Sequence, residues 1–502
     1  MHPKKNVFVL LLILSLSVMQ QPVYSQSFDH IKAAVEKFTL DNGMKFIVLE
    51  RHEAPVVSFH IYADVGSANE SYGITGISHL LEHMAFKGSK VVGTSNYEAE
   101  ATLFPQMDDL YEKLNREKIK VDPDTALIAG YEKQFNDLRE QAKQHVVNNE
   151  YFDMMMREGD AGVNAGTSTD ATHYTNSLPS NRLEYWMSIT SDRFLNPVFR
   201  EFYKEKDVVM EERRLRTETQ PIGRLIEDFL ATTFKAHPYH HSIVGHMSDI
   251  RRVTRRDVID YWNQYYIPSN LTVGIVGDVK AAEVQRMARL YFGRIPSNPK
   301  PETVRTEEPE QWGERHVNVK AQSQPILIVG YHRPSALHPD DPALLALANI
   351  IGQGRSSRLY ELLVKQKRVA VQTGCFNGFP GDKFPNLIAL FGISTPGHSS
   401  DECLELIDQE IEKIKQESVT EEELRKFKRS TIKGLIEGMK SNSNMAHQLT
   451  YYDVVQGDWR LLFDSVGKVE AITAEDIKRV ANKYLVTENR TIGEVIPEQA
   501  SN

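Results

Sequence analysis

The feature that most restricts the fold of this chain is an internal repeat at a fixed separation of 219 positions. Seven residues of the first copy recur with the same identity in the second: Thr254, Asp257, Asn263, Tyr265, Asn270, Thr272 and Gly274 match Thr473, Asp476, Asn482, Tyr484, Asn489, Thr491 and Gly493. Each copy predicts a helix, a turn and a strand. Identical residue types at one offset favour duplication over chance, so we expect two halves that share a fold.

A proline-rich segment lies between the two copies. Its prolines stand among glutamate, threonine and asparagine without apolar periodicity, which is typical of a linker. We therefore predict a linker at residues 296–316, between an N-terminal domain at 26–295 and a C-terminal domain at 317–502. With 502 residues, 41% of them hydrophobic and 25% charged, the chain is long enough for two globular domains.

Strand and helix signals alternate in the first half. Asn42 and Gly43 separate two apolar runs and predict a hairpin turn, and the alternating apolar residues from Val57 to Val65 predict a half-buried strand. The first domain is therefore expected to mix α and β structure.

The first half also contains a segment without a counterpart in the second half. Residues Tyr97 to Lys118 and Thr125 to His145 are rich in helix-forming residues and flank a proline turn. We predict a helical hairpin inserted in the first domain over about residues 98–150. It is either a solvated arm or an element that docks a partner or gates substrate.

The first 25 residues predict a secretory signal peptide. Lys4 and Lys5 precede an apolar core from Val7 to Val18, and Ser25 ends a small-residue cleavage site. This core is shorter than the ~20 residues that span a membrane, no later segment is as apolar for that length, and no cysteine follows the core for lipid attachment. We expect an exported protein without a stable membrane anchor.

Charge and cysteine content exclude several classes of protein. The formal net charge is −9, or −11 without Lys4 and Lys5, which gives no electrostatic basis for binding nucleic acid or an anionic membrane. Cys375 and Cys403 are the only two cysteines, too few for a disulfide framework. Whether they pair stays open.

The residues with catalytic potential begin with His79-Leu80-Leu81-Glu82-His83. The apolar residues around them predict a buried helix, whose start Thr75 or Ser78 can cap. On a helix, His79 and His83 lie on one face and can bind one metal ion, with Glu82 beside them. A catalytic zinc needs a third protein ligand and an open position for water, from which a neighbouring carboxylate takes a proton.

This motif alone can arise by chance, with the histidines simply buried in a core. Further segments decide the matter: Gly76 to Gly88, Asn164 to Ser168, Asp192 to Phe194, Glu205 to Arg216 and Ser356 to Tyr360. Together they resemble the M16 peptidase family, the pitrilysin and mitochondrial-processing-peptidase group, over nearly all of the mature chain. The resemblance implies an α+β fold of two homologous α/β sandwich domains, each with a mainly antiparallel sheet covered by helices.

The resemblance also implies one Zn²⁺ per chain, with a third ligand on a later acidic helix. Glu212 is our choice; Glu205 lies two turns away on the same face, whereas Glu211 points about 100° away. Glu205 then suits the orientation of a histidine through its free ring N–H. The alternative for this helix is a solvated acidic surface.

The sequence departs from the family at one spacing. Glu212 lies 129 positions after His83, longer than is usual, and the inserted hairpin accounts for the difference. Such an insertion adds little closure entropy, so the ligand set can survive it.

Two further segments bear on the site. Asn164 and Ala165 resemble the start of the family's substrate-binding edge strand, which pairs with an extended peptide by main-chain hydrogen bonds; the alternative is an ordinary edge strand. Four histidines between His237 and His246 suggest a second metal site, but Pro238 interrupts them and no family ligand maps there.

The second half is expected to be catalytically silent, because residues 343–351 replace the zinc helix and contain neither His nor Glu. Val364 and Val371 occupy the positions where the family's complementary half places an Arg and a Tyr near the scissile carbonyl. We therefore expect a related chain to complete the site in a heterodimer, with a homodimer as the alternative.

The sequence predicts a secreted zinc endopeptidase that hydrolyses peptides or small unfolded proteins through a water activated by Glu82, in the periplasm of a Gram-negative bacterium. The alternative is a non-catalytic or weakly active assembly subunit of a heteromeric complex. A zinc-stabilised binding protein would need a closed site of four ligands, and only three are visible.

Overall fold

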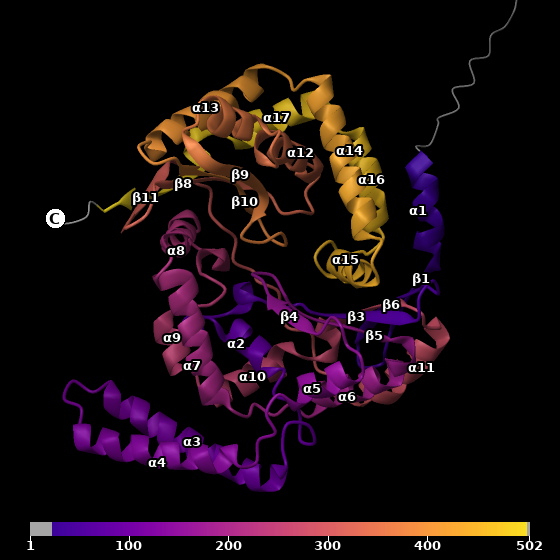
Figure 1. Cartoon of the computed structure of the whole chain (residues 1–502), viewed down its shortest axis with the longest axis vertical. Helices are drawn as coiled ribbons and strands as arrows, with labels where there is room; N and C mark the ends of the chain where they lie inside the picture. The colour runs from indigo at the N-terminus through magenta and orange to yellow at the C-terminus, as the bar shows by residue number, and fades with distance from the viewer. Residues whose placement is uncertain (1–22, 499–502) are drawn as a thin grey trace, which may run out of the picture.

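The computed structural model describes residues 23–498 and consists of two halves, each built on one sheet (Figure 1). The predicted signal peptide lies outside the described residues except for Val23 to Ser25, which begin helix α1 (Val23–Ala34). Within the described residues, no helix combines the length and apolar content needed to cross a membrane.

Within residues 23–498, the first sheet has six strands in the order β1-β2-β6-β3-β5-β4. Their bounds are β1 (Val35–Thr39), β2 (Lys45–Glu50), β3 (Val56–Ala63), β4 (Asn164–Thr167), β5 (Thr172–Pro179) and β6 (Leu271–Gly277). Only the β2–β6 pair is parallel among these described strands. The hairpin turn predicted at Asn42 and Gly43 joins β1 to β2, and Gly43 has a φ of 94° there.

The second sheet, over the same described residues, has five strands in the order β7-β11-β8-β10-β9. Their bounds are β7 (Arg315–Ala321), β8 (Ile326–Arg333), β9 (Ala370–Phe379), β10 (Asn386–Ser394) and β11 (Arg490–Pro497). The β7–β11 pair is parallel and the other pairs are antiparallel, as for β2–β6 and its neighbours in the first sheet. The α+β class and the two homologous, mainly antiparallel sheets are thus confirmed.

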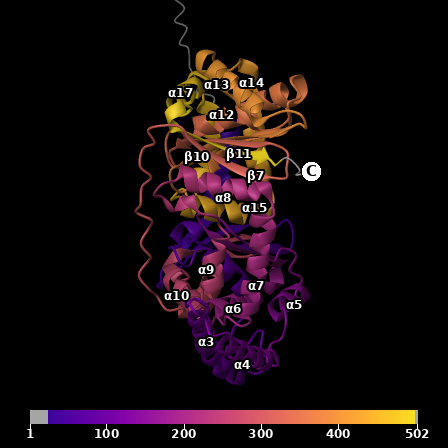
Figure 2. The same ribbon diagram turned by 90° about the vertical axis from the view of Figure 1, so that its left-hand side faces the viewer.

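Helices cover both sheets (Figures 1 and 2). Those between β3 and β7 are α2 (Ile77–Met84), α3 (Tyr97–Lys118), α4 (Thr125–Lys143), α5 (Glu150–Arg157), α6 (Leu183–Leu195), α7 (Phe202–Arg213), α8 (Pro221–Thr233), α9 (Met247–Arg252), α10 (Arg255–Tyr265) and α11 (Ala281–Tyr291). Those after β8 are α12 (Asp341–Gly352), α13 (Ser400–Gln416), α14 (Glu421–Gly438), α15 (Asn442–Val454), α16 (Leu461–Ala471) and α17 (Ala474–Tyr484).

The sequence repeat corresponds to α10–β6 in one half and α17–β11 in the other. Both helices begin with a capping box, formed by Thr254 with Asp257 and by Thr473 with Asp476. Each box satisfies backbone N–H groups that a helix start leaves unpaired. The repeated threonine and aspartate therefore fix where the two helices begin.

The repeated asparagines join each helix to its sheet. The Asn270 Nδ2 atom donates to the last carbonyl of α10 at 3.0 Å and to the Asp64 carbonyl, beyond β3, at 3.2 Å. Asn489 makes the same two contacts, to the last carbonyl of α17 at 3.1 Å and to the His332 carbonyl in β8 at 2.7 Å. A side-chain amide bridges two backbone segments in the same way in both halves.

Each half packs one of its helices on the sheet of the other half. Helix α8 of the first half packs on β7 and β11, and α15 of the second half packs on β3 and β6 (Figure 1). The contact is close at Gly274, where a Cβ atom would lie 2.7 Å from the Ala446 carbonyl oxygen. At Gly493 a Cβ atom would lie 2.9 Å from Ile328 and 3.0 Å from Phe229 of α8. The two repeated glycines leave room for these packing contacts.

Strand β3 differs from its prediction. Its alternating sequence predicts one buried face, but every residue from Val57 to Ala63 is buried. The reason is α15, which covers the second face; there the Thr450 hydroxyl and His60 Nδ1 lie 2.7 Å apart. A strand between a helix layer of its own half and a helix of the other half has no solvent face.

Residues 295–314 form neither helix nor strand and run along one side of the molecule (Figure 2). The helices α3 and α4 of the predicted hairpin are present and project from the first half. The exact domain limits, including the linker at 296–316, stay a prediction. Cys375 and Cys403 are both free and buried thiols.

Replacing Gly274 with Ala should lower the free energy of unfolding by about 1–3 kcal/mol, because the new methyl group overpacks the contact between β6 and α15. Gly467 in α16 is a matched control, since a Cβ atom there meets nothing within 4 Å and alanine favours a helix. Chemical denaturation measures both variants. Equal stability of Gly274→Ala and Gly467→Ala would contradict the tight interface.

Candidate metal centre

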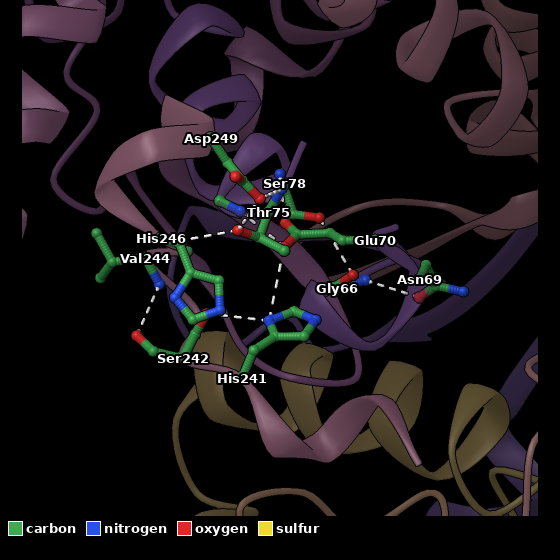
Figure 3. Close-up of polar contacts among 12 residues, drawn as sticks. Gly66, Asn69, Glu70, Thr75, Ser78, His241, Ser242, Val244, His246 and Asp249 are labelled. Atoms are coloured by element: carbon green, nitrogen blue, oxygen red, sulfur yellow. Dashed lines mark hydrogen bonds and ion pairs between the residues drawn. The ribbon is translucent and has the colours of Figure 1, made fainter. Parts of the chain in front are cut away.

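The helix with the two histidines, α2, is held at its start by a buried carboxylate (Figure 3). The Glu70 side chain accepts the backbone N–H of Gly76 at 2.7 Å and of Ser78 at 2.8 Å. The prediction that Thr75 or Ser78 caps this helix is therefore wrong. The Thr75 hydroxyl instead donates to Asp249 at 2.8 Å and the Ser78 hydroxyl to the Gly66 carbonyl at 3.1 Å, so both hydroxyls bond to groups outside the helix.

Two effects shift the pKa of Glu70 at this helix start in opposite directions. Burial raises the pKa of Glu70 to about 8, while the two N–H groups favour its ionised form. Gly76 adopts a φ of 88°, and a Cβ atom there would lie 2.2 Å from the Val244 carbonyl oxygen, so only glycine fits. These contacts fix the position of α2 and hence of its side chains.

Three predicted ligands converge between α2 and α7. One ligand atom each of His79, His83 and Glu212 lies within 4.8 Å of the others. The distances from His79 Nε2 and His83 Nε2 to the Glu212 carboxylate oxygens are both 3.6 Å. These distances are too long for hydrogen bonds, but ligand atoms ~2.0–2.2 Å from a tetrahedral zinc lie ~3.4 Å apart. The donor set therefore fits a zinc ion.

The surroundings shift the pKa values of His79 and His83 in opposite directions. Burial lowers the pKa of His79 to about 3, so that its imidazole is neutral, as metal binding requires. Burial alone would also lower the pKa of His83, but the carboxylates of Glu205, Glu212 and Glu82 raise it. A cation bound between the two rings would replace the proton that these carboxylates favour.

Glu205 lies behind His83, as predicted for a residue that orients it. The Glu205 Oε2 atom is 3.6 Å from His83 Nδ1, and Glu205 Oε1 accepts the Lys87 ammonium at 2.6 Å. Although burial opposes the effect, His83 and Lys87 lower the pKa of Glu205 to about 2. Glu205 is therefore a fixed anion on the side of the ring opposite Glu212, and its orienting role stays a prediction.

Glu82, the predicted general base, accepts the Thr167 hydroxyl at 2.6 Å on its Oε2 atom. Burial raises the pKa of Glu82, and this hydrogen bond opposes the increase. The sequence does not predict a role for Thr167, although Thr167 lies in the segment Asn164 to Ser168 that resembles the family. The contact between Thr167 and Glu82 depends on how β4 packs against α2, and no local sequence pattern encodes that packing.

Strand β4 is an edge strand with one described neighbour, β5. Asn164 is exposed and Ala165 half-buried at its start. A cavity of about 720 Å³ contains His79, Glu82, His83, Ala165 and Glu212 in its lining, together with Phe379 and Pro380 of the second half. A peptide can reach the candidate metal site along the free edge of β4, while substrate contact by Asn164 and Ala165 stays a prediction.

The second half supplies no comparable group within residues 23–498, where the three residues above form the one set of clustered metal-binding side chains. Helix α12 follows β8 as α2 follows β3, but its inner face is apolar and buried. Val364 is half-buried, Val371 is 50% exposed on the edge strand β9, and neither lines the 720 Å³ cavity. The histidines from His237 to His246 form no second metal cluster in the described chain.

Comparison with known proteins gives matches over most of the chain. The family model described as Insulinase (Peptidase family M16) matches residues 45–103 and 143–246, and the Peptidase M16 inactive domain matches 252–431. Zinc protease PqqE of Helicobacter pylori is 29% identical, over 89% of this chain and 90% of that protein.

Two solved structures share the fold. A protease from Helicobacter pylori superposes with a TM-score of 0.77 at 27% identity, covering 92% of this chain and 99% of that one. The first half of the periplasmic protease PqqL from Escherichia coli gives a TM-score of 0.65 at 16% identity, covering 92% of each chain.

Glu212→Gln should lose most of its metal, because an amide oxygen is a weaker zinc ligand than a carboxylate. The matched control is Glu211→Gln, since Glu211 is exposed on the adjacent position of α7. Elemental analysis after dialysis measures the zinc content of both variants. If Glu211→Gln loses the metal and Glu212→Gln keeps it, the third ligand is misassigned.

Proposed function

We propose that this chain, which belongs to the M16 peptidase family, is a zinc-dependent endopeptidase that hydrolyses peptides or small unfolded proteins. The observation that carries the proposal is the convergence of His79, His83 and Glu212 with Glu82 beside them. Two imidazoles and one carboxylate are the ligands of catalytic zinc sites that leave a position open.

The proposed chemistry divides between metal and protein. When bound, zinc supplies a Lewis acid that polarises the scissile carbonyl and acidifies water. Glu82 takes the proton of the attacking water and returns it to the leaving amine. The proton would reside on Glu82 Oε1, because Oε2 accepts the Thr167 hydroxyl.

The remaining residues position these groups. Glu205, whose Oε2 atom lies 3.6 Å from His83 Nδ1, orients the His83 ring by its negative charge, which leaves Nε2 for the metal. The edge of β4 beginning at Asn164 and Ala165 binds the substrate as an added antiparallel strand. A non-catalytic assembly subunit is the second candidate, but loss of a ligand would favour it and no predicted ligand is lost.

We also propose that the chain is exported to the periplasm of a Gram-negative bacterium. The basic start and apolar core of residues 1–25 support export. The similar fold of the periplasmic protease PqqL adds support for that compartment.

Glu82→Gln should retain zinc and lose peptidase activity by ~100-fold or more, because the amide cannot accept the proton of the attacking water. Glu98→Gln, an exposed position of α3, is the control for a generic charge change. Zinc analysis and cleavage of a quenched fluorescent peptide report binding and catalysis separately. Full activity of zinc-loaded Glu82→Gln would exclude Glu82 as the base.

The active form is proposed to be a dimer with a related chain, because Val364 and Val371 stand where the family places an Arg and a Tyr. Donors directed at a developing oxyanion contribute about 3 kcal/mol each, and aliphatic side chains cannot replace them. The zinc-loaded chain alone should therefore turn over unstructured peptides slowly, and a co-exported relative that has this Arg and Tyr should restore the rate.

The matched test uses the relative with its Arg changed to Ala, which should bind but not activate. Ordinary peptidase rates from the isolated chain, unchanged by the relative, would contradict the need for a partner.

A further inference from the structure

We infer that the substrate groove continues from the metal site to the underside of the inserted hairpin, where it binds an apolar side chain of an extended peptide. The inference rests on the proposed peptidase function and assigns the hairpin a role in substrate selection. It also predicts that the enzyme prefers longer peptides over short ones.

The first observation is that three neighbouring cavities share lining residues. The 720 Å³ cavity at the metal site shares Glu82, His83 and Ala165 with a second cavity of about 320 Å³. The second cavity shares Val146 and Glu201 with a third of about 330 Å³. Neighbouring cavities therefore follow one another from the candidate metal ligands to the hairpin.

The third cavity has an apolar floor. Phe104 and Met107 of α3, Phe199 and Phe202 line it, and all four are at least 94% buried. Charged side chains such as Arg139 and Lys143 of α4 stand at its rim. An apolar floor within a charged rim suits an aliphatic or aromatic side chain whose flanking main chain stays in water.

The hairpin is fixed to the body, so this wall of the groove is preformed. The buried Arg200 guanidinium binds the Glu100 carboxylate of α3 at 3.1 Å. Further along α3, Asp108 accepts the Arg255 guanidinium at 2.6 Å and the Tyr203 hydroxyl at 2.9 Å. A buried ion pair and a half-buried one hold α3 against the body at two places, one on each side of Phe104 and Met107.

The position of the third cavity beyond the candidate metal site indicates that an extended peptide substrate occupies it. A peptide added to β4 is extended, and at about 3.3 Å per residue each added residue moves its end further along the groove. The M16 family model leaves residues 104–142 unmatched, so this wall is an addition to the shared catalytic frame. A substrate that leaves the catalytic frame on this side meets the hairpin next.

The test measures binding without turnover, on full-length zinc-loaded Glu82→Gln protein. Labelled unstructured peptides of about 6 and about 14 residues are compared by fluorescence anisotropy, with one leucine moved through successive positions of the longer peptide. We expect the best long peptide to bind about tenfold more tightly than the short one, or about 1.4 kcal/mol. The gain should depend on the position of the leucine.

Tryptophan variants test where on the protein the gain in affinity arises. Asn148→Trp and Ala142→Trp fill the third cavity, at an exposed and a buried position respectively, and each should reduce the long-to-short affinity ratio about tenfold. Leu127→Trp, at the outer end of the hairpin beyond the groove, is the matched control and should retain the ratio. The exposed position of Asn148 keeps the test valid if Ala142→Trp fails to fold.

The outcomes separate the two proposals. Length-independent binding, or the same ratio in all three tryptophan variants, would overturn the hairpin subsite. A change in dimerisation instead of the ratio would assign the cavity to a partner chain and also overturn it. Absence of cleavage by the parent protein with its partner would refute the peptidase proposal, whereas the binding result would still decide the groove.

Discussion

The structure depends on the reciprocal packing of α8 and α15, each on the sheet of the opposite half. Helix α8 follows α7 after the five-residue π-turn from Arg214 to Glu218, so the helix that carries Glu212 leads directly into the contact with the second sheet. Phe229 of α8 is fully buried and packs against Gly493. The second half has no metal-binding cluster among the described residues, yet its sheet packs against the helix that follows the one with Glu212.

One ion pair and one hydrogen bond of Arg213 connect α8 back to the site. Arg213, next to Glu212, donates to the Glu227 carboxylate of α8 at 2.8 Å and to the Gly245 carbonyl. Gly245 in turn packs on Gly76 at the start of α2. The same arginine thus links the helix of the third ligand, the inter-half helix and the start of the histidine helix.

Much of this could be predicted from the sequence, because several signals are local. The hairpin helices begin at the predicted residues Tyr97 and Thr125, since Asn96 and Asp124 cap them through side-chain contacts that sequence patterns describe. The spacing of His79 and His83 likewise encodes a shared helix face. Choosing Glu212 rather than Glu211 needed only helix periodicity together with the family resemblance.

The features that were missed are those formed by residues distant in the sequence. Glu70 caps α2 from outside the helix, and Thr167 reaches Glu82 from a strand 85 positions later. The second buried face of β3 arises from α15, nearly 400 positions away. No propensity or periodicity specifies such pairs, because they depend on how the two halves pack together.

The long interval between His83 and Glu212 shows how an inserted segment can leave two distant side chains close together. The two ends of the hairpin segment meet in an antiparallel bridge between Thr94 and Val146, and the Ser95 N–H donates to the His145 carbonyl at 2.7 Å. The inserted segment therefore leaves and re-enters the domain at one point. Because loop-closure entropy grows only slowly with length, the added residues need little compensation at that point. The insertion can vary beside the site while α2 and α7 keep the three candidate ligands together.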